Sequence, residues 1–138
     1  MTNASSRPQA TIDEMDDPAA LHFILDIQLK AVSALASCLP EISEAAARVA
    51  HCIRGGGRLI YCGAGSSGLI ALQDAAELPG TFGLDPRRIL FLMAGGLHQA
   101  QDLKGHVEDD EEQAKQDLDR LEPQAPDLMI ALSASGST

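Results

Sequence analysis

The sequence predicts an α/β fold, a three-layer α/β/α sandwich in which helices cover both faces of a parallel sheet. Three observations support this fold class. Short apolar segments alternate along the chain with segments whose apolar residues recur at helical spacing. The short segments are almost continuously apolar, as strands are when both faces of a sheet are buried. The chain is 45% hydrophobic but only 3% aromatic, so the core is expected to be aliphatic.

The first part of the chain is predicted to be helical. Residues 1–16 are polar and show no sustained period, which indicates a mobile arm. Asp17 is a candidate N-cap for a helix that ends near residue 39, where a proline follows. A second helix is expected over 41–54, because the three glycines at 55–57 stop it. Residues 17–54 are therefore predicted to form a region of N-terminal helices.

Residues 55–138 are predicted to form the sheet domain. The expected strands are 58–62, 88–93 and 127–133, and the expected helices are 66–78 and 98–121. Pro79 and Gly80 mark the expected end of the first of these helices. Three strands make a thin sheet, and the chain stops where another helix should begin. We therefore expect this domain to be incomplete at its C-terminus.

Composition excludes several partners. The net charge of −10 disfavours nucleic acid and anionic membrane surfaces, and no uninterrupted apolar run approaches the length of a membrane span. The three cysteines are an odd number without CxxC spacing, which is typical of a reduced, cytoplasmic protein with buried thiols. Neither the cysteines nor the four histidines have the spacing of metal ligands. We expect no metal and no organic cofactor.

Two loops share the same residue pattern. "GAGSSG" at 63–68 follows the first expected strand, and "SASGST" at 133–138 follows the third. The carboxyl ends of parallel strands lie at one edge, where backbone amides, hydroxyls and a helix N-terminus can hold a phosphate without a basic side chain. Alternatively, the glycines only form a tight turn and Ser66 caps the helix. A dinucleotide is disfavoured because the second strand ends in "FLMAGG", without an acidic residue for a ribose.

Taken in order, the stretches "GGGRLIYCGAGSSG", "DAAELPGTFG", "MAGG", "EDDEEQAKQDL" and "SASGST" resemble the sugar isomerase (SIS) domain. Within it they are similar to the N-acetylmuramic acid 6-phosphate etherases and the glucokinase regulatory protein. The resemblance implies a parallel sheet of flavodoxin-like strand order, a phosphorylated amino sugar as ligand and a homodimer. It also implies a lyase that eliminates D-lactate and then adds water, using glutamates as acid and base and no metal.

The resemblance assigns candidate site residues. Those that match the phosphate-binding loops are Gly65, Ser66, Ser67, Ser133, Ser135 and Thr138. Glu77 matches a catalytic glutamate, a role that suits a carboxyl group beside an aldehyde-derived carbon and an ether leaving group. It lies 11 residues beyond Ser66, roughly 16 Å along a straight helix. Glu77 must therefore follow a break in the helix, serve another subunit's site, or be merely solvated.

Two functions remain open on these grounds. The first is a lyase with Glu77 as its main acid–base group. The second is a phosphosugar-binding module without catalysis, because Gly105 stands where the family carries its second glutamate. An aldose–ketose isomerase is disfavoured by the etherase-like stretch "DAAELPGTFG".

Overall fold

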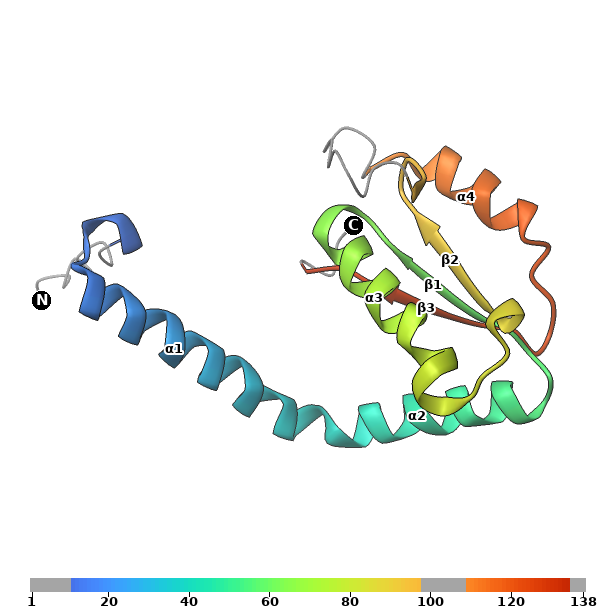
Figure 1. The fold of residues 1–138 in the computed structure, drawn as a ribbon, viewed down its shortest axis with the longest axis horizontal. Coiled ribbons are helices and arrows are strands. Elements are labelled where there is room, and N and C mark those ends of the chain that lie inside the picture. The colour runs from blue at the N-terminus through green and yellow to red at the C-terminus, as the bar shows by residue number, and fades with distance from the viewer. Residues whose placement is uncertain (1–10, 98–108, 135–138) are drawn as a thin grey trace, which may run out of the picture. The chain divides into compact units, whose positions relative to one another are not determined.

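The computed structural model describes residues 11–97 and 109–134 of the chain (Figure 1). The chain forms two compact units, residues 1–44 and 45–138. In order, the elements are η1 (Ile12–Glu14), α1 (Asp17–Ala34), η2 (Leu35–Cys38), α2 (Leu39–Arg54), β1 (Leu59–Gly63), α3 (Gly65–Phe82), η3 (Pro86–Arg88), β2 (Ile89–Met93), α4 (Glu111–Arg120) and β3 (Leu128–Leu132).

The first unit is helical, with three departures from expectation. The N-cap of α1 is Asp16, whose carboxylate accepts a 2.9 Å hydrogen bond from the amide of Ala19; the predicted cap, Asp17, is the first helical residue. Pro40 does not separate two helices, because it lies in the first turn of α2, where a missing amide costs little. Cys38 is exposed on η2, so the expectation of buried thiols is wrong for this residue.

The segment Asp17–Arg54 is also long and apolar enough, by length and composition, to cross a membrane. It contains no uninterrupted apolar run of that length, because polar residues interrupt it, among them the exposed ion pair of Asp26 and Lys30. A single segment of this kind is weak evidence for a span, since helices of soluble proteins pass the same test.

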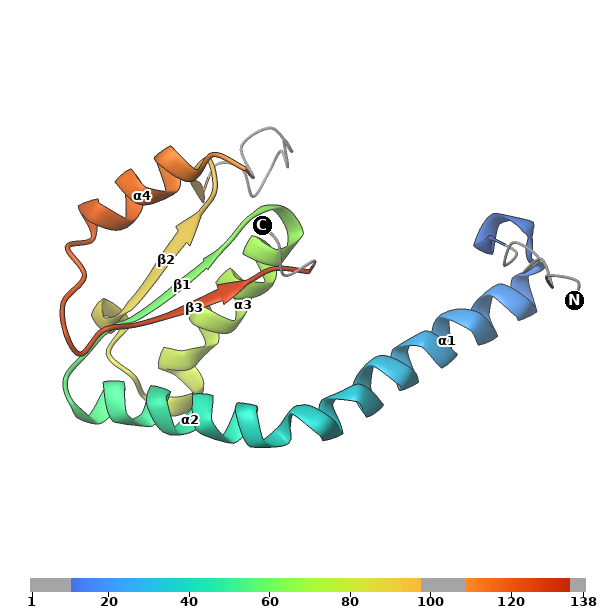
Figure 2. The same ribbon diagram turned by 180° about the vertical axis from the view of Figure 1, so that it is seen from behind.

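The second unit is built on a parallel sheet of strand order β2-β1-β3 (Figure 2). Leu59 in β1 pairs with Ile89 in β2 and with Leu128 in β3, and the register continues without a slip to the ends of all three strands. The central position of β1 confirms the predicted flavodoxin-like order for these strands. The predicted α/β class with a parallel sheet is confirmed as well.

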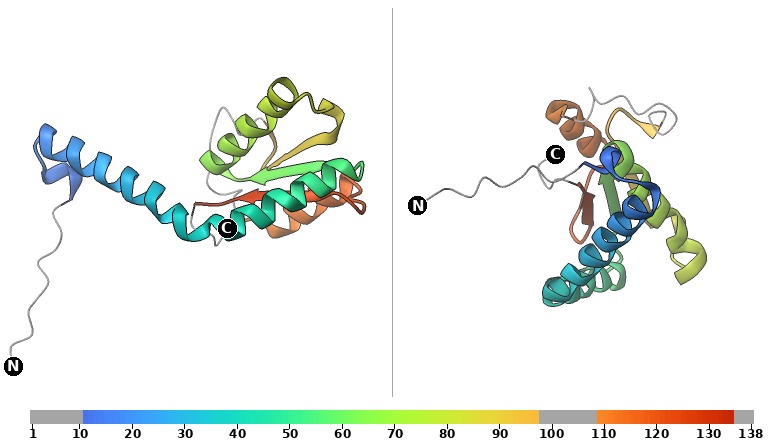
Figure 3. Two further views of the ribbon diagram at one scale, coloured as in Figure 1. Left: turned by 90° about the horizontal axis from the view of Figure 1, so that it is seen from below. Right: turned by 90° about the vertical axis from the view of Figure 1, so that its left-hand side faces the viewer.

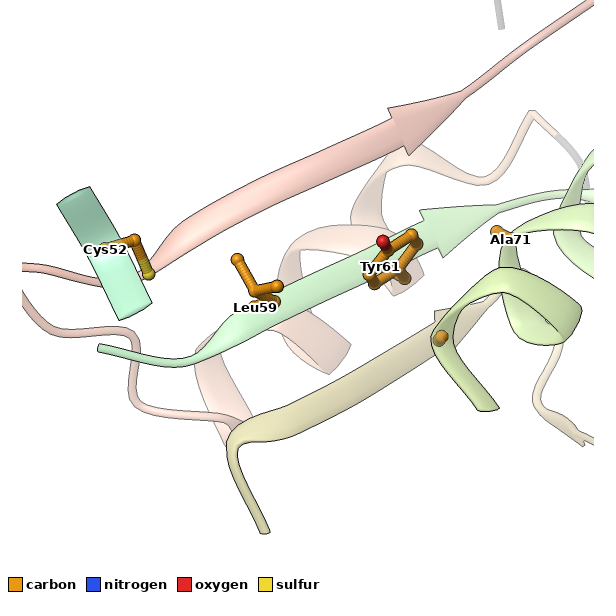
Figure 4. Packing of buried hydrophobic residues seen from close by; sticks show 5 residues of the cluster. Cys52, Leu59, Tyr61 and Ala71 are labelled. Carbon is orange, nitrogen blue, oxygen red and sulfur yellow. The ribbon is translucent and has the colours of Figure 1, made fainter. Parts of the chain in front are cut away.

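Alternate side chains of β1 supply two different faces of the sheet. Leu59 and Tyr61 point to the face covered by α3 and by the end of α2, where they form the core with Cys52, Ala71 and Ala75 (Figure 4). Cys62 and its neighbours in the other strands face α4 across a cavity. The sheet thus lies between α3 and α4, as Figure 3 shows.

The helix after β1 is longer than predicted. Its expected stop at Pro79 and Gly80 is wrong, because α3 continues through both residues to Phe82. Proline removes one amide donor, yet its carbonyl still accepts a 3.0 Å hydrogen bond from the amide of Gly83. Gly83 ends the helix with a left-handed backbone, φ 67°. Of the helix expected over 98–121, residues 111–120 are observed as α4, and 98–108 lie outside the described residues.

Candidate functional site

The ends of the strands meet at one edge of the sheet. Gly63, the last residue of β1, pairs with Met93 in β2 and with Leu132 in β3. The loop after β1 therefore lies beside Ser133, which directly follows β3. This confirms that the two glycine- and serine-containing segments leave neighbouring strands at the same edge. Of the candidate residues in the second segment, Ser135 and Thr138 lie outside the described residues.

The N-terminus of α3 offers backbone donors at this edge. The N-cap is Ala64, which has no side chain able to accept a hydrogen bond from the first turn. The expectation that Ser66 caps the helix is therefore wrong, because Ser66 lies within the first turn. The amides of Gly65, Ser66 and Ser67 have no intrahelical partner, as in any helix of this kind, and the helix dipole favours an anion there. Ser67 is half-buried and Ser66 is exposed.

Two of the three glycines in "GAGSSG", Gly63 and Gly68, pack directly against each other. A methyl group on Gly63 would lie 2.9 Å from both the Cα and the amide nitrogen of Gly68, which is closer than real side chains come. The first turn of α3 is thus packed directly against the end of β1. Gly65 has a left-handed backbone, φ 49°, which places the following amides at the start of the helix. The glycines therefore fix the position of the candidate anion site.

A cavity of about 330 Å³ opens at the same edge. Its rim includes Gly63, Ala64, Gly95 and Ser133, taken from the ends of all three strands. Its lining continues between the sheet and α4 and is mainly apolar. The cavity gives the edge room for a small ligand next to the donors of α3. Neither Ser67 nor Glu77 is among the described residues that line it.

Sequence reasoning missed the part of α4 that lines this cavity. Gln113, Asp117 and Leu118 line it, although no candidate site residue was expected on this helix. The side-chain Nε2 of Gln113 donates a 2.8 Å hydrogen bond to the carboxylate of Asp117, one turn further along the helix. Their spacing, which places them on one face of a helix, was the sequence signal that could have predicted this lining. It was obscured by the many acidic side chains of the segment.

Cys62 also lines the cavity, on the central strand. Burial raises the pKa of its thiol, so the thiol is protonated at neutral pH. A protonated thiol is a poor nucleophile, which argues against thiolate chemistry at this edge. In the described ranges, no three histidine, cysteine, aspartate or glutamate side chains lie close enough together to hold a metal ion.

Glu77 is exposed on α3, three turns away from the candidate anion site. The helix is unbroken from Gly65 to Phe82, so Glu77 lies roughly 16 Å along it from Ser66. Of the two catalytic geometries considered for Glu77, an early break in the helix is wrong. Glu77 can act at such a site only if that site belongs to another copy of the chain.

The fold and this edge together define a class of protein: an α/β protein whose parallel sheet has, at the carboxyl ends of its strands, the N-terminus of a helix and a candidate ligand site. The chain matches the pattern of the SIS domain family over residues 23–138 and belongs to that family. The resemblance found in the sequence is thereby confirmed.

Three curated proteins that are similar to the chain share the name N-acetylmuramic acid 6-phosphate etherase. The chain is 36% identical, over its full length, to the N-acetylmuramic acid 6-phosphate etherase of Klebsiella aerogenes, of which it covers 46%. It is 39% identical over 92% of its length to the same-named protein of Caldanaerobacter subterraneus subsp. tengcongensis, of which it covers 42%. It is 38% identical over 92% of its length to the same-named protein of Mycolicibacterium smegmatis, of which it covers 43%. The chain spans about half the length of these relatives.

Proposed function

We propose that this chain binds a phosphorylated amino sugar as part of a lyase resembling the N-acetylmuramic acid 6-phosphate etherases. The observation that carries the proposal is the meeting of two strand ends, Gly63 and Leu132, beside the uncapped N-terminus of α3. Amides and hydroxyls at that point suit a phosphate group. A protein with a net charge of −10 needs such local donors to hold an anionic ligand.

The phosphate is assigned to the first turn of α3 and to the end of β3. The amides of Gly65, Ser66 and Ser67 and the serine hydroxyls donate to its oxygens, with Ser133 adding a donor from the neighbouring strand. Ser135 and Thr138 extend the second segment in the same role. The sugar then lies toward the cavity, whose rim is formed by the same strand ends. No metal or organic cofactor takes part in this proposal.

Glu77 is the proposed acid–base group. In the elimination, a carboxylate takes the proton from the carbon beside the masked aldehyde, and the ether bond at the next carbon breaks. The lactate leaves with a proton supplied by a carboxylic acid, and water then adds to the double bond. Because Glu77 is three turns from its own loop, the proposal includes a homodimer in which it acts on the other subunit's sugar. We place this chemistry in the cytoplasm, in keeping with unpaired cysteines.

The test is lactate release. The chain is incubated with N-acetylmuramic acid 6-phosphate, D-lactate is assayed, and binding is followed in parallel by calorimetry. N-acetylmuramic acid without the phosphate serves as the control and should not bind. Release of lactate that is abolished by Glu77→Gln supports the lyase. If neither sugar binds, the proposed phosphosugar site is wrong.

A second function is favoured by two observations. Glu77 is exposed and distant from its own loop, and Gly105 occupies the position of the family's second glutamate. A phosphosugar-binding module without turnover fits both facts. Binding of the phosphorylated sugar with no lactate, in wild type and in Glu77→Gln alike, would support this module over the lyase.

A further inference from the structure

The cavity between the sheet and α4 has a mainly apolar interior. Cys62, Leu92 and Ala131 line it from the three strands, and Leu118 lines it from α4. A sugar ring carries hydroxyl groups on most of its carbons, and burying them against apolar side chains without hydrogen-bond partners costs free energy. The interior therefore suits an apolar substituent of the ligand better than it suits the ring.

We propose that this interior binds the N-acyl group of the amino sugar and accepts acyl chains longer than acetyl. The inference rests on the proposed function, because it takes the phosphate to be held at the rim by the first turn of α3. In a pyranose, the carbon that carries the nitrogen lies across the ring from the carbon that leads to the 6-phosphate. A sugar held at the rim by its phosphate can therefore direct its acyl group into the cavity.

The charge of the lining favours the acyl group over the lactyl group of the same sugar. Among the described residues, the lining holds the carboxylates of Asp110 and Asp117 and one ammonium group, that of Lys115. The ammonium group of Lys115 is itself paired at 4.0 Å with Glu111. The lactyl group ends in a carboxylate, which the two aspartates repel, whereas the acylamino group is uncharged.

Gln113 supplies a polar partner for the amide of the acyl group. Its Nε2 donates a 2.8 Å hydrogen bond to Oδ1 of Asp117, and Nη1 of Arg120 donates a 2.5 Å hydrogen bond to the same oxygen. Because a carboxylate only accepts, the first bond fixes the orientation of the Gln113 amide and turns its Oε1 away from Asp117. That oxygen is the acceptor for the N–H of the acylamino group.

The cavity is larger than an acetyl group requires. An acetyl group has three non-hydrogen atoms, and a water molecule, which has one, takes about 30 Å³ in the liquid. An acetyl group therefore fills roughly a third of the 330 Å³, which leaves room for propionyl and butyryl groups. A fully buried methylene strengthens binding by about fourfold. Met129 in the lining is 41% exposed, so burial of the chain is partial and about twofold to fourfold per methylene is expected.

Calorimetry with a series of ligands tests the inference. N-acetyl-, N-propionyl- and N-butyrylglucosamine 6-phosphate differ only in the length of the acyl chain. The Kd is expected to fall by about twofold to fourfold with each methylene. A Kd that stays constant or rises along the series overturns the acyl site and leaves the phosphosugar site standing. If none of the three ligands binds, the phosphosugar site is wrong and the acyl site falls with it.

Two matched substitutions locate the acyl chain. Ala131→Leu adds volume inside the cavity, whereas Ala76→Leu makes the same change at an exposed position of α3. Ala131→Leu should remove or reverse the gain along the series, and Ala76→Leu should keep it. Glucose 6-phosphate, which has no acyl group, should still bind to Ala131→Leu and shows that its phosphate site is intact. An equal gain per methylene in both variants would place the acyl chain outside the cavity.

Gln113→Leu tests the polar partner separately. It should weaken the three acyl ligands alike, by about fivefold, because each loses the same hydrogen bond. The gain per methylene should remain as in the wild type, because the apolar lining is retained. An unchanged Kd for all three ligands would overturn the role of Gln113.

Cys62 offers a reading that does not depend on affinity. Its thiol lines the interior, Cys52 is buried, and the exposed Cys38 is removed by Cys38→Ser. At saturating ligand, alkylation of Cys62 by iodoacetamide is followed by mass spectrometry. The butyryl ligand should slow it more than the acetyl ligand, and glucose 6-phosphate should slow it least. Equal rates with and without the butyryl ligand would show that the chain does not enter the cavity.

Discussion

The backbones of Gly63 and Gly68 are in direct contact. A methyl group on Gly63 would lie 2.9 Å from the Cα of Gly68, and one on Gly68 would lie 3.0 Å from the carbonyl oxygen of Gly63. This contact joins the last residue of β1 to the first turn of α3. It therefore holds the helix N-terminus, with its unpaired amides, at the edge where β3 also ends.

Gly63→Ala is expected to lower the free energy of unfolding by about 1–3 kcal/mol, because the new methyl group overpacks a backbone contact that cannot move cheaply. Chemical denaturation followed by circular dichroism measures the change. Gly80→Ala, in α3, is the control, since a methyl group there meets nothing within 4 Å. The control should be neutral or slightly stabilising. Equal effects of the two variants would show that the contact between Gly63 and Gly68 is not tight.

Tyr61 is expected to titrate well above its ordinary range. Its hydroxyl donates a 2.6 Å hydrogen bond to Asp74 on α3, and the residue is only 5% exposed. Burial raises the pKa of Tyr61 first, and the hydrogen bond and the charge of Asp74 raise it further. Tyr61 is the single tyrosine of the chain, so ultraviolet absorbance reports its phenolate alone.

The sign of the pH effect follows from the raised pKa. The stability contributed by neutral, buried Tyr61 is complete below pH 10, near the ordinary tyrosine pKa of about 10. It is lost as the pH rises from there through the higher pKa of the folded state. Asp74→Asn should lower the pKa of Tyr61 while leaving it raised, because burial remains. A titration midpoint at the ordinary value in the folded wild type would contradict this account.

Asp127 and Arg58 are expected to make the fold acid-sensitive. The carboxylate of Asp127 accepts hydrogen bonds from the amide, Nε and Nη2 of Arg58, at 2.8, 3.0 and 2.6 Å, and its side chain is 7% exposed. The Arg58 guanidinium holds the pKa of Asp127 well below its usual range. The pair joins the start of β1 to the loop before β3.

Because the pKa of Asp127 is lowered in the folded state, its contribution is complete above the ordinary aspartate pKa of about 4. That contribution is lost as the pH falls toward the lower folded-state pKa. Asp127→Asn should lower the melting temperature by several degrees at pH 7 and flatten its decline below pH 4. Asp26→Asn removes an exposed ion pair and should change little. If both variants melt alike, Asp127 has no special structural role.

The strands and their shared edge could be predicted, because they follow from the local pattern of apolar residues. The three strands were found from short apolar segments, and the strand order came from the resemblance to a known family. The adjacent ends of β1 and β3 followed from parallel topology, in which strand ends share an edge. These features depend on residue periodicity, which a sequence displays directly.

Features that depend on tertiary contacts were not predictable in the same way. Pro79 was expected to end α3, yet the helix continues to Phe82, where the left-handed Gly83 ends it and donates its amide to the carbonyl of Pro79. The contact of Gly63 with Gly68 cannot be distinguished, in sequence, from glycines that approach a ligand. The cavity lining from α4, with Gln113 and Asp117, was obscured because burial of a polar helix face depends on what lies opposite it.

Ser67→Ala is expected to weaken binding of N-acetylmuramic acid 6-phosphate by about fivefold or more. The reason is the loss of one hydrogen bond to a charged oxygen, worth at least about 1 kcal/mol. Ser67 lies half-buried in the first turn of α3, so its hydroxyl is close to the amides assigned to the phosphate. Calorimetry gives the Kd directly, and Thr81→Ala, at the far end of the same helix, is the control. A Kd that is the same in both variants and in wild type would place the phosphate elsewhere, because a hydroxyl that contacts it cannot be removed without loss.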